Sequence, residues 1–92
     1  MDKTRIIASA EAENIGEAYT TRVLVSERQY IVDEPKVFGG NDEGPAPAEY
    51  VCMALASCKA ITLRMYANRK KWEVGEIRVK VNMVKQDFAC TK

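Results

Sequence analysis

The sequence predicts one small α+β domain, in which a single long helix packs against a short antiparallel sheet. Three observations carry this prediction: apolar and polar residues alternate at strand period on both sides of the middle of the chain, a loop rich in glycine and proline follows the early strands, and an unbroken apolar segment follows that loop. The chain has 92 residues, which is enough for one domain only. We therefore expect residues 1–92 to form a single domain.

Charge and composition exclude several classes of function. Lys and Arg number 14 and Asp and Glu number 13, so the chain lacks the basic surface that a nucleic acid or an anionic membrane requires of its main partner. No stretch is apolar for long enough to span a membrane, and residues 1–5 do not lead into a signal-peptide core, so we expect a cytoplasmic protein. Because histidine is absent, Ser-His and Cys-His catalysis and the common zinc ligand sets are excluded, and we expect no metal or other cofactor.

The first third of the chain predicts three strands. Residues 5–13 form the first of them. Residues 19–25 alternate between apolar and polar side chains, as a half-buried strand does. Residues 26–27 then make a tight connection into a third strand at residues 28–32, which gives a hairpin.

One long helix and a last strand complete the predicted order, β-β-β-α-β. Residues 39–47 contain three glycines and two prolines, which is typical of a loop. Pro47 suits the first helical position, where its missing N–H has no consequence, and Glu49 falls in the first turn, where the helix dipole favours an anion. We expect this helix to run to about Asn68, and the alternation over residues 76–83 predicts the last strand.

The helix contains a segment with no polar face. Every residue from Tyr50 to Ala56 is apolar, and a helix that is apolar all round is buried on all sides. Four short strands cannot wrap such a helix alone. We therefore expect a homodimer in which the helices of two chains pack together.

Three cysteines are too few for a disulfide framework or a four-cysteine metal site, so we expect free thiols. Cys52 lies inside the apolar segment, where burial makes a thiol an inert packing group. Cys58 lies where the helix becomes amphipathic, and two interpretations of it stay open: a packed small side chain, or a thiol at the edge of the core. Cys90 lies close to the C-terminus.

Three stretches of the chain, residues 33–36, 39–50 and 54–67, resemble the OsmC-like family. This family includes osmotically inducible protein C and the organic hydroperoxide resistance proteins. The resemblance rests on the spacing of a Gly-Gly pair, a Gly-Pro-x-Pro motif, a glutamate and a Ser-Cys pair, and it covers roughly residues 19–84.

The resemblance implies an intertwined homodimer with a long buried central helix, and a thiol-dependent peroxidase that reduces small organic hydroperoxides with the help of a thiol reductant. In that interpretation Cys58 matches the peroxidatic cysteine, whose thiolate attacks the O–O bond and becomes a sulfenic acid. Family members activate it with an arginine of the N-terminal strands, held by a glutamate before the helix. Arg22 and Glu49 lie nearest to those positions, although an exposed strand arginine and a first-turn partner of the helix dipole explain them equally.

Family members also continue with another strand pair and a second helix, which carries a resolving cysteine beside a proline. The present sequence is expected to be a short form without that half, and Cys90 does not lie in such a context. Three hypotheses therefore stay open. The chain is a hydroperoxide reductase completed by an external thiol or by Cys90, a non-catalytic dimerising half-domain that binds an apolar molecule, or an interaction module that pairs its open sheet edge with another protein.

Overall fold

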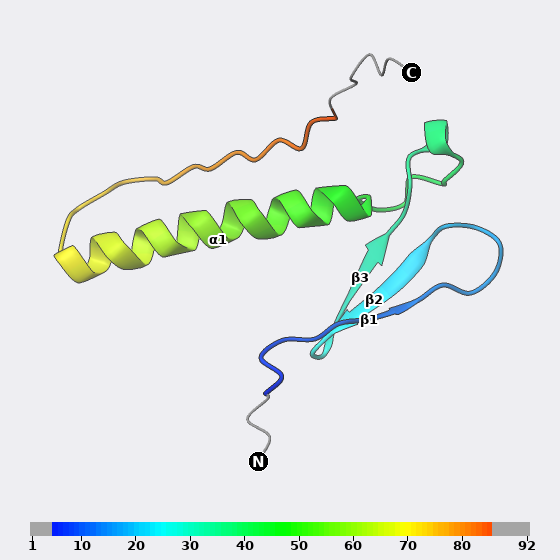
Figure 1. The fold of residues 1–92 in the computed structure, drawn as a ribbon, viewed down its shortest axis with the longest axis horizontal. Helices are drawn as coiled ribbons and strands as arrows, with labels where there is room; N and C mark the ends of the chain where they lie inside the picture. The colour runs from blue at the N-terminus through cyan, green and yellow to red at the C-terminus, as the bar shows by residue number, and fades with distance from the viewer. Residues whose placement is uncertain (1–4, 86–92) are drawn as a thin grey trace, which may run out of the picture. The chain divides into compact units, whose positions relative to one another are not determined.

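The structure is a computed structural model that describes residues 5–85. The chain divides after Pro47 into two units, which we call the strand unit (Met1–Pro47) and the helix unit (Ala48–Lys92). The strand unit holds β1, β2 and β3 and a short 3-10 helix at Lys36–Phe38, and the helix unit holds nearly all of α1 and the segment that follows it (Figure 1).

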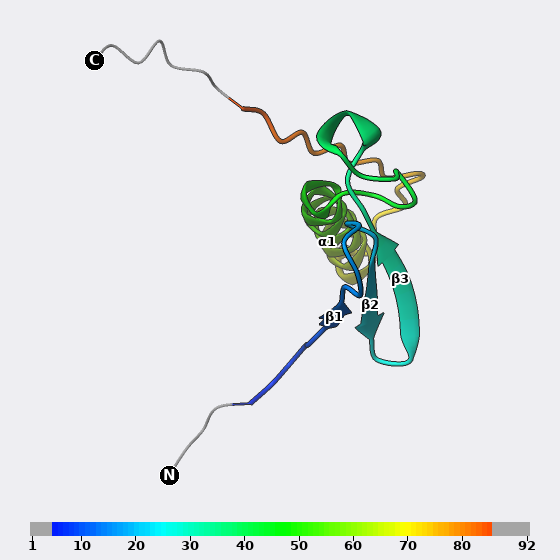
Figure 2. The ribbon, with the colours of Figure 1, turned by 90° about the vertical axis from the view of Figure 1, so that its right-hand side faces the viewer.

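The strand unit is a three-stranded antiparallel sheet in the order β1-β2-β3 (Figure 2). β1 spans Glu11–Glu13, β2 spans Thr21–Val25 and β3 spans Arg28–Val32. The third strand is confirmed over its whole length and the second begins two residues later than predicted. The first is much shorter than predicted, because β1 finds partners on β2 only at its last three residues.

The register of the sheet decides which side chains meet. Val23 pairs with Tyr30, so these two side chains share one face of the hairpin. Arg22 pairs with Glu13 on β1, and the guanidinium donates to the Glu13 carboxylate in an exposed ion pair. The alternation read from the sequence thus gives β2 one half-buried side and one exposed side.

α1 spans Pro47–Lys70 and confirms the predicted helix with two further residues at its end. It stops in a hydrogen-bonded cap, in which the N–H of Trp72 donates to the carbonyl of Ala67 at 2.9 Å and the N–H of Lys71 donates to that of Asn68 at 3.1 Å. Lys71 adopts the left-handed conformation that such a cap requires, with φ of 62°. The Trp72 ring packs edge-on against Tyr66, with their centroids 5.6 Å apart. Within residues 5–85, no helix has the length and apolar character needed to cross a membrane.

The strand predicted at residues 76–83 is not formed. The segment is extended and runs back along α1 (Figure 1), but no other strand of the described residues pairs with it. Its alternation still has an effect, because Ile77, Val79 and Val81 are half-buried while the residues between them are exposed. The prediction was wrong because a strand needs a hydrogen-bonded neighbour, which a side-chain pattern does not provide.

The extended segment covers one narrow stripe of α1. The stripe consists of Cys52, Ala56 and Ala60, which follow one another at four-residue spacing and are half-buried. Arg64 continues the stripe, and its guanidinium donates to the carbonyls of Val74 at 3.0 Å and Gly75 at 2.6 Å. This arginine, whose role the sequence did not indicate, holds the segment to the helix where the chain turns back.

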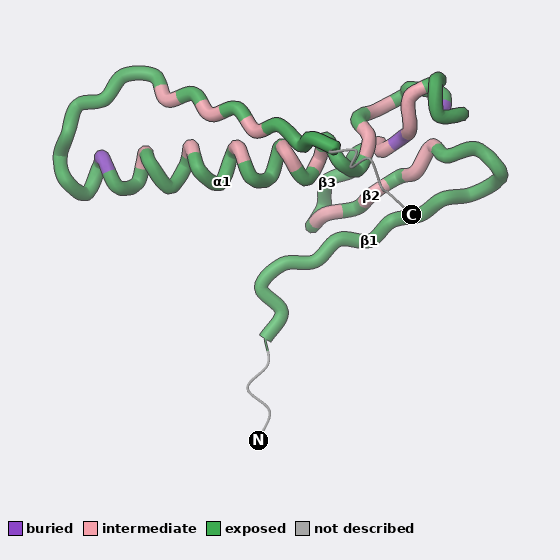
Figure 3. The backbone as a smooth tube through the Cα atoms, turned by 45° about the horizontal axis from the view of Figure 1, so that its top comes forward, coloured by how far each residue is buried: buried purple, intermediate pink, exposed green. Residues whose placement is uncertain are grey.

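The rest of α1 is exposed in the single chain, and the burial predicted for a homodimer stays a prediction. Val51, Met53 and Leu55 of the all-apolar segment each keep about half of their surface exposed, and among the described residues only Asp33, Gly40 and Ala67 are buried (Figure 3). Within residues 48–85 the extended segment is the only part of the helix unit that covers α1, so the other faces of the helix keep apolar side chains exposed within that unit.

Candidate functional site

The residues singled out by the sequence fall in both units, and each group is described within its own unit. In the strand unit they are Arg22 on β2 and the motif residues of the loop between β3 and α1. In the helix unit they lie on α1 itself.

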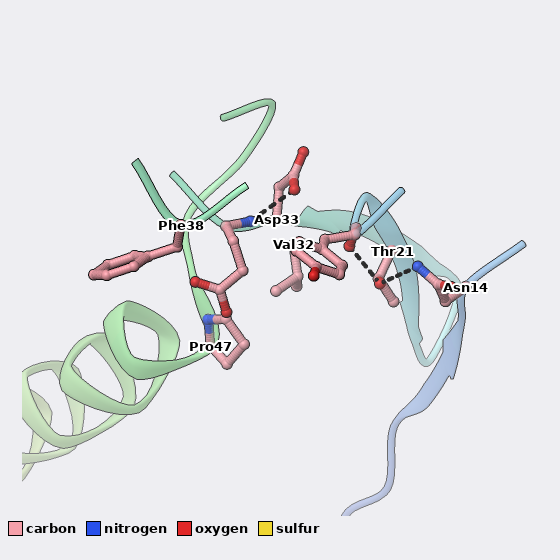
Figure 4. Close-up of a pocket in the computed structure, with 8 residues that line it drawn as sticks. Asn14, Thr21, Val32, Asp33, Phe38 and Pro47 are labelled. Carbon is pink, nitrogen blue, oxygen red and sulfur yellow. Dashed lines mark hydrogen bonds between the residues drawn. The ribbon is translucent and has the colours of Figure 1, made fainter. Parts of the chain in front are cut away.

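The carboxylate of Asp33 organises the loop that follows β3. Asp33 is 1% exposed, and its two oxygens accept the Thr20 hydroxyl at 2.7 Å and the backbone N–H groups of Glu34 at 2.7 Å and Glu43 at 3.2 Å. Figure 4 shows the Asp33 side chain and one of these hydrogen bonds. The Thr20 hydrogen bond, with those from the backbone N–H groups of Glu34, Glu43 and Asn41, lowers the pKa of Asp33 although burial opposes this effect. The buried group is therefore a carboxylate at neutral pH, and it ties the end of β3 to the far side of the loop.

Backbone hydrogen bonds hold the same loop against the end of β3. The N–H of Asp33 donates to the carbonyl of Pro45 at 3.1 Å, and the N–H of Asp42 donates to that of Glu34 at 3.0 Å. The chain thus folds back on itself immediately before Pro47, the first residue of α1. These hydrogen bonds hold the last residues of the loop beside the end of β3.

Two glycines of the family-like motif are required by this close approach. A Cβ at Gly40 would lie 2.0 Å from the carbonyl oxygen of Glu34, and a Cβ at Gly44 would lie 2.3 Å from that of Ile31. Both oxygens belong to the backbone, so neither can move aside as a flexible side chain would. The Gly-Gly and Gly-Pro pairs therefore lie where the loop backbone comes close to the backbone of β3 and of the residues just after it.

A shallow hollow of about 470 Å³ lies beside the loop, with exposed aromatic side chains of Tyr19 and Phe38 in its wall (Figure 4). Two of its polar side chains are engaged within the wall, since the Asn14 amide donates to the Thr21 hydroxyl at 3.1 Å and that hydroxyl donates to the carbonyl of Tyr19 at 2.9 Å. The hollow thus combines aromatic side chains with polar ones, among them the acidic residues Asp33 and Glu34.

Cys58 is an exposed free thiol near the middle of α1. Its neighbours on the same helix face, three and four residues away, are Ala54, Leu55, Ile61 and Thr62. None of these positions carries a cation that would favour the thiolate. A positive charge that activates Cys58 must come from another part of the chain or from another molecule.

The other predicted site residues do not join Cys58 on its helix face. Glu49 is exposed, and nine residues of helix place it about 180° around the axis and about 13 Å along it from Cys58. Arg22 belongs to the strand unit, where Glu13 holds its guanidinium. Cys90 lies outside the described residues.

Cys52 is half-buried rather than fully buried, beside Val81 and Met83 of the extended segment. Within residues 5–85 no three Cys, His, Asp or Glu side chains are grouped as metal ligands would be.

Sequence reasoning did not find the role of Asp33. The available signal was a single acidic residue directly after the strand at residues 28–32, followed by Glu34 and Pro35. Such a residue is also a common turn former at the surface. Its burial follows only from the return of the loop, which brings the N–H of Glu43 to the carboxylate.

Replacing Gly40 by Ala is expected to lower the free energy of unfolding by about 1–3 kcal/mol, because the added methyl group meets a backbone oxygen that cannot retreat. Urea unfolding measures the change. Gly75→Ala is the matched control: no atom lies within 4 Å of its added Cβ, so the change should stay within about 0.5 kcal/mol. Equal effects of the two substitutions would contradict the close approach.

Asp33→Asn is expected to destabilise the protein at neutral pH and to make much less difference in acid. The pKa of folded Asp33 lies below the ordinary value of 3.8, so its contribution is present above that value and is lost as the pH falls through the folded pKa. Urea unfolding at a fixed protein concentration, from pH 7 down to about pH 3, checks the convergence of the two proteins. The exposed Asp42→Asn serves as control, and a constant difference for Asp33→Asn at all pH values would refute the assignment.

Comparison with known proteins gives one result that bears on this geometry. The family model described as OsmC-like protein matches residues 39–91, which is more than half of the chain and includes Gly40, Gly44, Glu49 and Cys58. No curated protein and no solved structure shows significant similarity to the chain. The matched region contains the glycines that close the loop and the helix that carries the exposed thiol. The chain belongs to the family of OsmC-like proteins.

Proposed function

We propose that the protein is a thiol-dependent peroxidase that reduces small organic hydroperoxides, with Cys58 as the peroxidatic cysteine. One observation carries the proposal: a free, exposed thiol stands on α1 within the region that matches the family. The reaction belongs to a reducing compartment such as the cytoplasm, where cysteines persist as thiols.

The proposed chemistry uses Cys58 alone in its first step. The thiolate attacks one oxygen of the peroxide, the O–O bond breaks, and the second oxygen takes a proton and leaves in an alcohol. Cys58 is then a sulfenic acid. A second thiol displaces its hydroxyl as water to form a disulfide, and a further thiol of the reductant restores Cys58. The second thiol is that of an external reductant or of Cys90.

Activation of Cys58 needs a nearby cation, because the middle of a helix gives a thiolate no help from the helix dipole. Arg22 is the arginine that we propose for this role. The resemblance implies an arginine held by a glutamate, and Arg22 is held by a glutamate in the strand unit, although the residue is Glu13 rather than Glu49. The ion pair leaves side-chain surface of both residues exposed, which supports an interaction with a further group.

We also propose that the active form is a homodimer. The support is the exposed apolar surface of α1, where Val51, Met53 and Leu55 each keep about half of their surface exposed. Apolar side chains of this kind are what a helix partner from a second copy would cover.

Two observations support a second, non-catalytic function. The helix neighbours of Cys58 are uncharged, and the hollow beside Phe38 has aromatic side chains in its wall. Both observations favour a non-catalytic dimer that binds an apolar molecule or a protein partner. The two functions differ in whether Cys58 reacts with peroxide.

Cys58→Ser is expected to abolish the turnover of tert-butyl hydroperoxide with dithiothreitol as reductant, since no other residue replaces the attacking sulfur. Cys52→Ser is the matched control, because it removes a thiol from the covered stripe of the same helix, and it should keep at least half of the activity. Peroxide consumption is measured directly. Equal consumption by the wild type and Cys58→Ser would rule out the peroxidase and favour the binding function.

A further inference from the structure

The hollow beside the loop after β3 has the size of a small-molecule site. Its volume of about 470 Å³ lies within the usual range of such sites. Tyr19 and Phe38 contribute rings that are 51% and 70% exposed, and Asp33 and Glu34 contribute acidic side chains. All of the lining residues belong to the strand unit, so the hollow forms without any part of the helix unit.

The two rings reach the hollow from segments that are far apart in the sequence. Tyr19 lies just before β2, and Phe38 ends the short 3-10 helix. A Cβ built on Gly39 would lie 3.4 Å from Cε2 of Tyr19, so the Tyr19 ring lies against the backbone that directly follows Phe38. The face of an aromatic ring carries partial negative charge and attracts a cation. Two such rings in one wall therefore favour a positively charged ligand.

The acidic residues of the wall favour the same charge. Asp33 is a carboxylate at neutral pH, because the Thr20 hydroxyl and backbone N–H groups stabilise its charge and lower its pKa. Its oxygens are occupied by those donors, so Asp33 acts on a ligand through its field rather than by contact. Glu34 is half-buried and belongs to no ion pair within residues 5–85. No Lys or Arg of the described chain lines the hollow, and the exposed Lys36 lies outside its wall, so the potential there is negative.

The neutral polar side chains of the wall offer little to an anion or a metal ion. The Asn14 amide donates to the carbonyls of Ala18 and Thr20 and to the Thr21 hydroxyl. That hydroxyl donates to the carbonyl of Tyr19, so an anion would find only the Tyr19 hydroxyl as a side-chain donor. A metal ion needs several ligands, and the described residues contain no group of three acidic or other ligating side chains. An organic cation fits the wall better than either.

We propose that the hollow binds a small quaternary ammonium compound of the choline type, with its trimethylammonium group against the rings of Tyr19 and Phe38 and beside the Glu34 carboxylate. Such a cation carries no N–H, so it loses no hydrogen bond when it leaves water for a wall whose neutral polar groups are already paired. Aromatic rings are what proteins use to recognise a quaternary ammonium group. A neutral apolar molecule would use the rings but not the negative charge. Binding requires neither Cys58 nor a peroxide, so the site is independent of the proposed peroxidase.

Titration of the ¹⁵N-labelled protein with choline chloride tests the site, with sodium chloride reduced in step so that the ionic strength stays constant. The amide signals of residues 19–21 and 33–38 should shift and saturate, with a dissociation constant of about 1–10 mM for a ligand of this size. The matched neutral ligand is 3,3-dimethylbutan-1-ol, in which a carbon atom replaces the nitrogen of choline. It should bind at least about fivefold more weakly, because it has the shape of choline without the charge.

Three substitutions separate the contributions to binding. Glu34→Gln should weaken choline binding about fivefold by removing the charge, and Phe38→Leu about threefold by replacing a ring with another apolar side chain. Glu27→Gln is the matched control, because it removes the same charge from the exposed hairpin turn of the same unit, outside the wall. It should change the dissociation constant by less than about twofold. Cys58→Ser should bind choline as the wild type does.

Each outcome decides the proposal. Saturable shifts of these amides, with weaker binding of the alcohol and of choline to the Glu34→Gln and Phe38→Leu proteins, support it. Equal affinity for choline and the alcohol would overturn it in favour of an apolar site. Absence of saturable binding, or equal losses for Glu34→Gln and Glu27→Gln, would also overturn it. A wild type that binds choline but does not reduce peroxide would keep this site and refute the peroxidase alone.

Discussion

The rest of the structure depends on one constraint, which is that α1 is a 24-residue helix with apolar side chains on more faces than the described part of its own unit covers. Within residues 48–85 the only cover is the extended segment, which protects a stripe of small residues and is held by Arg64. Small side chains along that stripe let the backbone approach the helix closely, so the segment uses little of the apolar surface. The large apolar side chains point elsewhere and are left to water. Apart from glycine, Ala67 is therefore the only apolar residue that is buried among the described residues.

The strand unit holds its own loop together with polar groups rather than with an apolar core. A carboxylate buried at Asp33 accepts hydrogen bonds from both sides of the loop, and glycines at positions 40 and 44 let the loop lie directly on backbone oxygens. A buried charge is tolerated here because it is hydrogen-bonded to a hydroxyl and to several backbone N–H groups. The family-like motif thus has a structural role that is separate from the thiol it precedes, and a variant in the loop can lose activity without touching Cys58.

Elements that depend on local sequence patterns were predicted well, and features that depend on distant parts of the chain were not. The hairpin and the long helix were predicted well, because alternation over residues 19–32 and an uninterrupted helical segment after Pro47 are local patterns. The strand at residues 76–83 was not, because its pattern specifies a covered side but not a hydrogen-bonded neighbour. Cys58 could be singled out from its Ser-Cys context, and it is exposed on α1. The nine-residue interval already indicated from the sequence that Glu49 lies on the opposite side of the helix from Cys58. Asp33 was missed because its burial is produced by residues ten positions further along.

The proposal that a second copy of the chain covers α1 is tested most directly by the molar mass of the native protein. Sedimentation equilibrium of the reduced protein, followed over a hundredfold dilution, reports the mass without relying on any thiol chemistry. We expect twice the chain mass of 10.3 kDa at the higher concentrations, because the proposed homodimer covers the apolar side chains that α1 exposes. A folded protein that stays at 10.3 kDa over the whole range, with the circular dichroism of a helix, would contradict it.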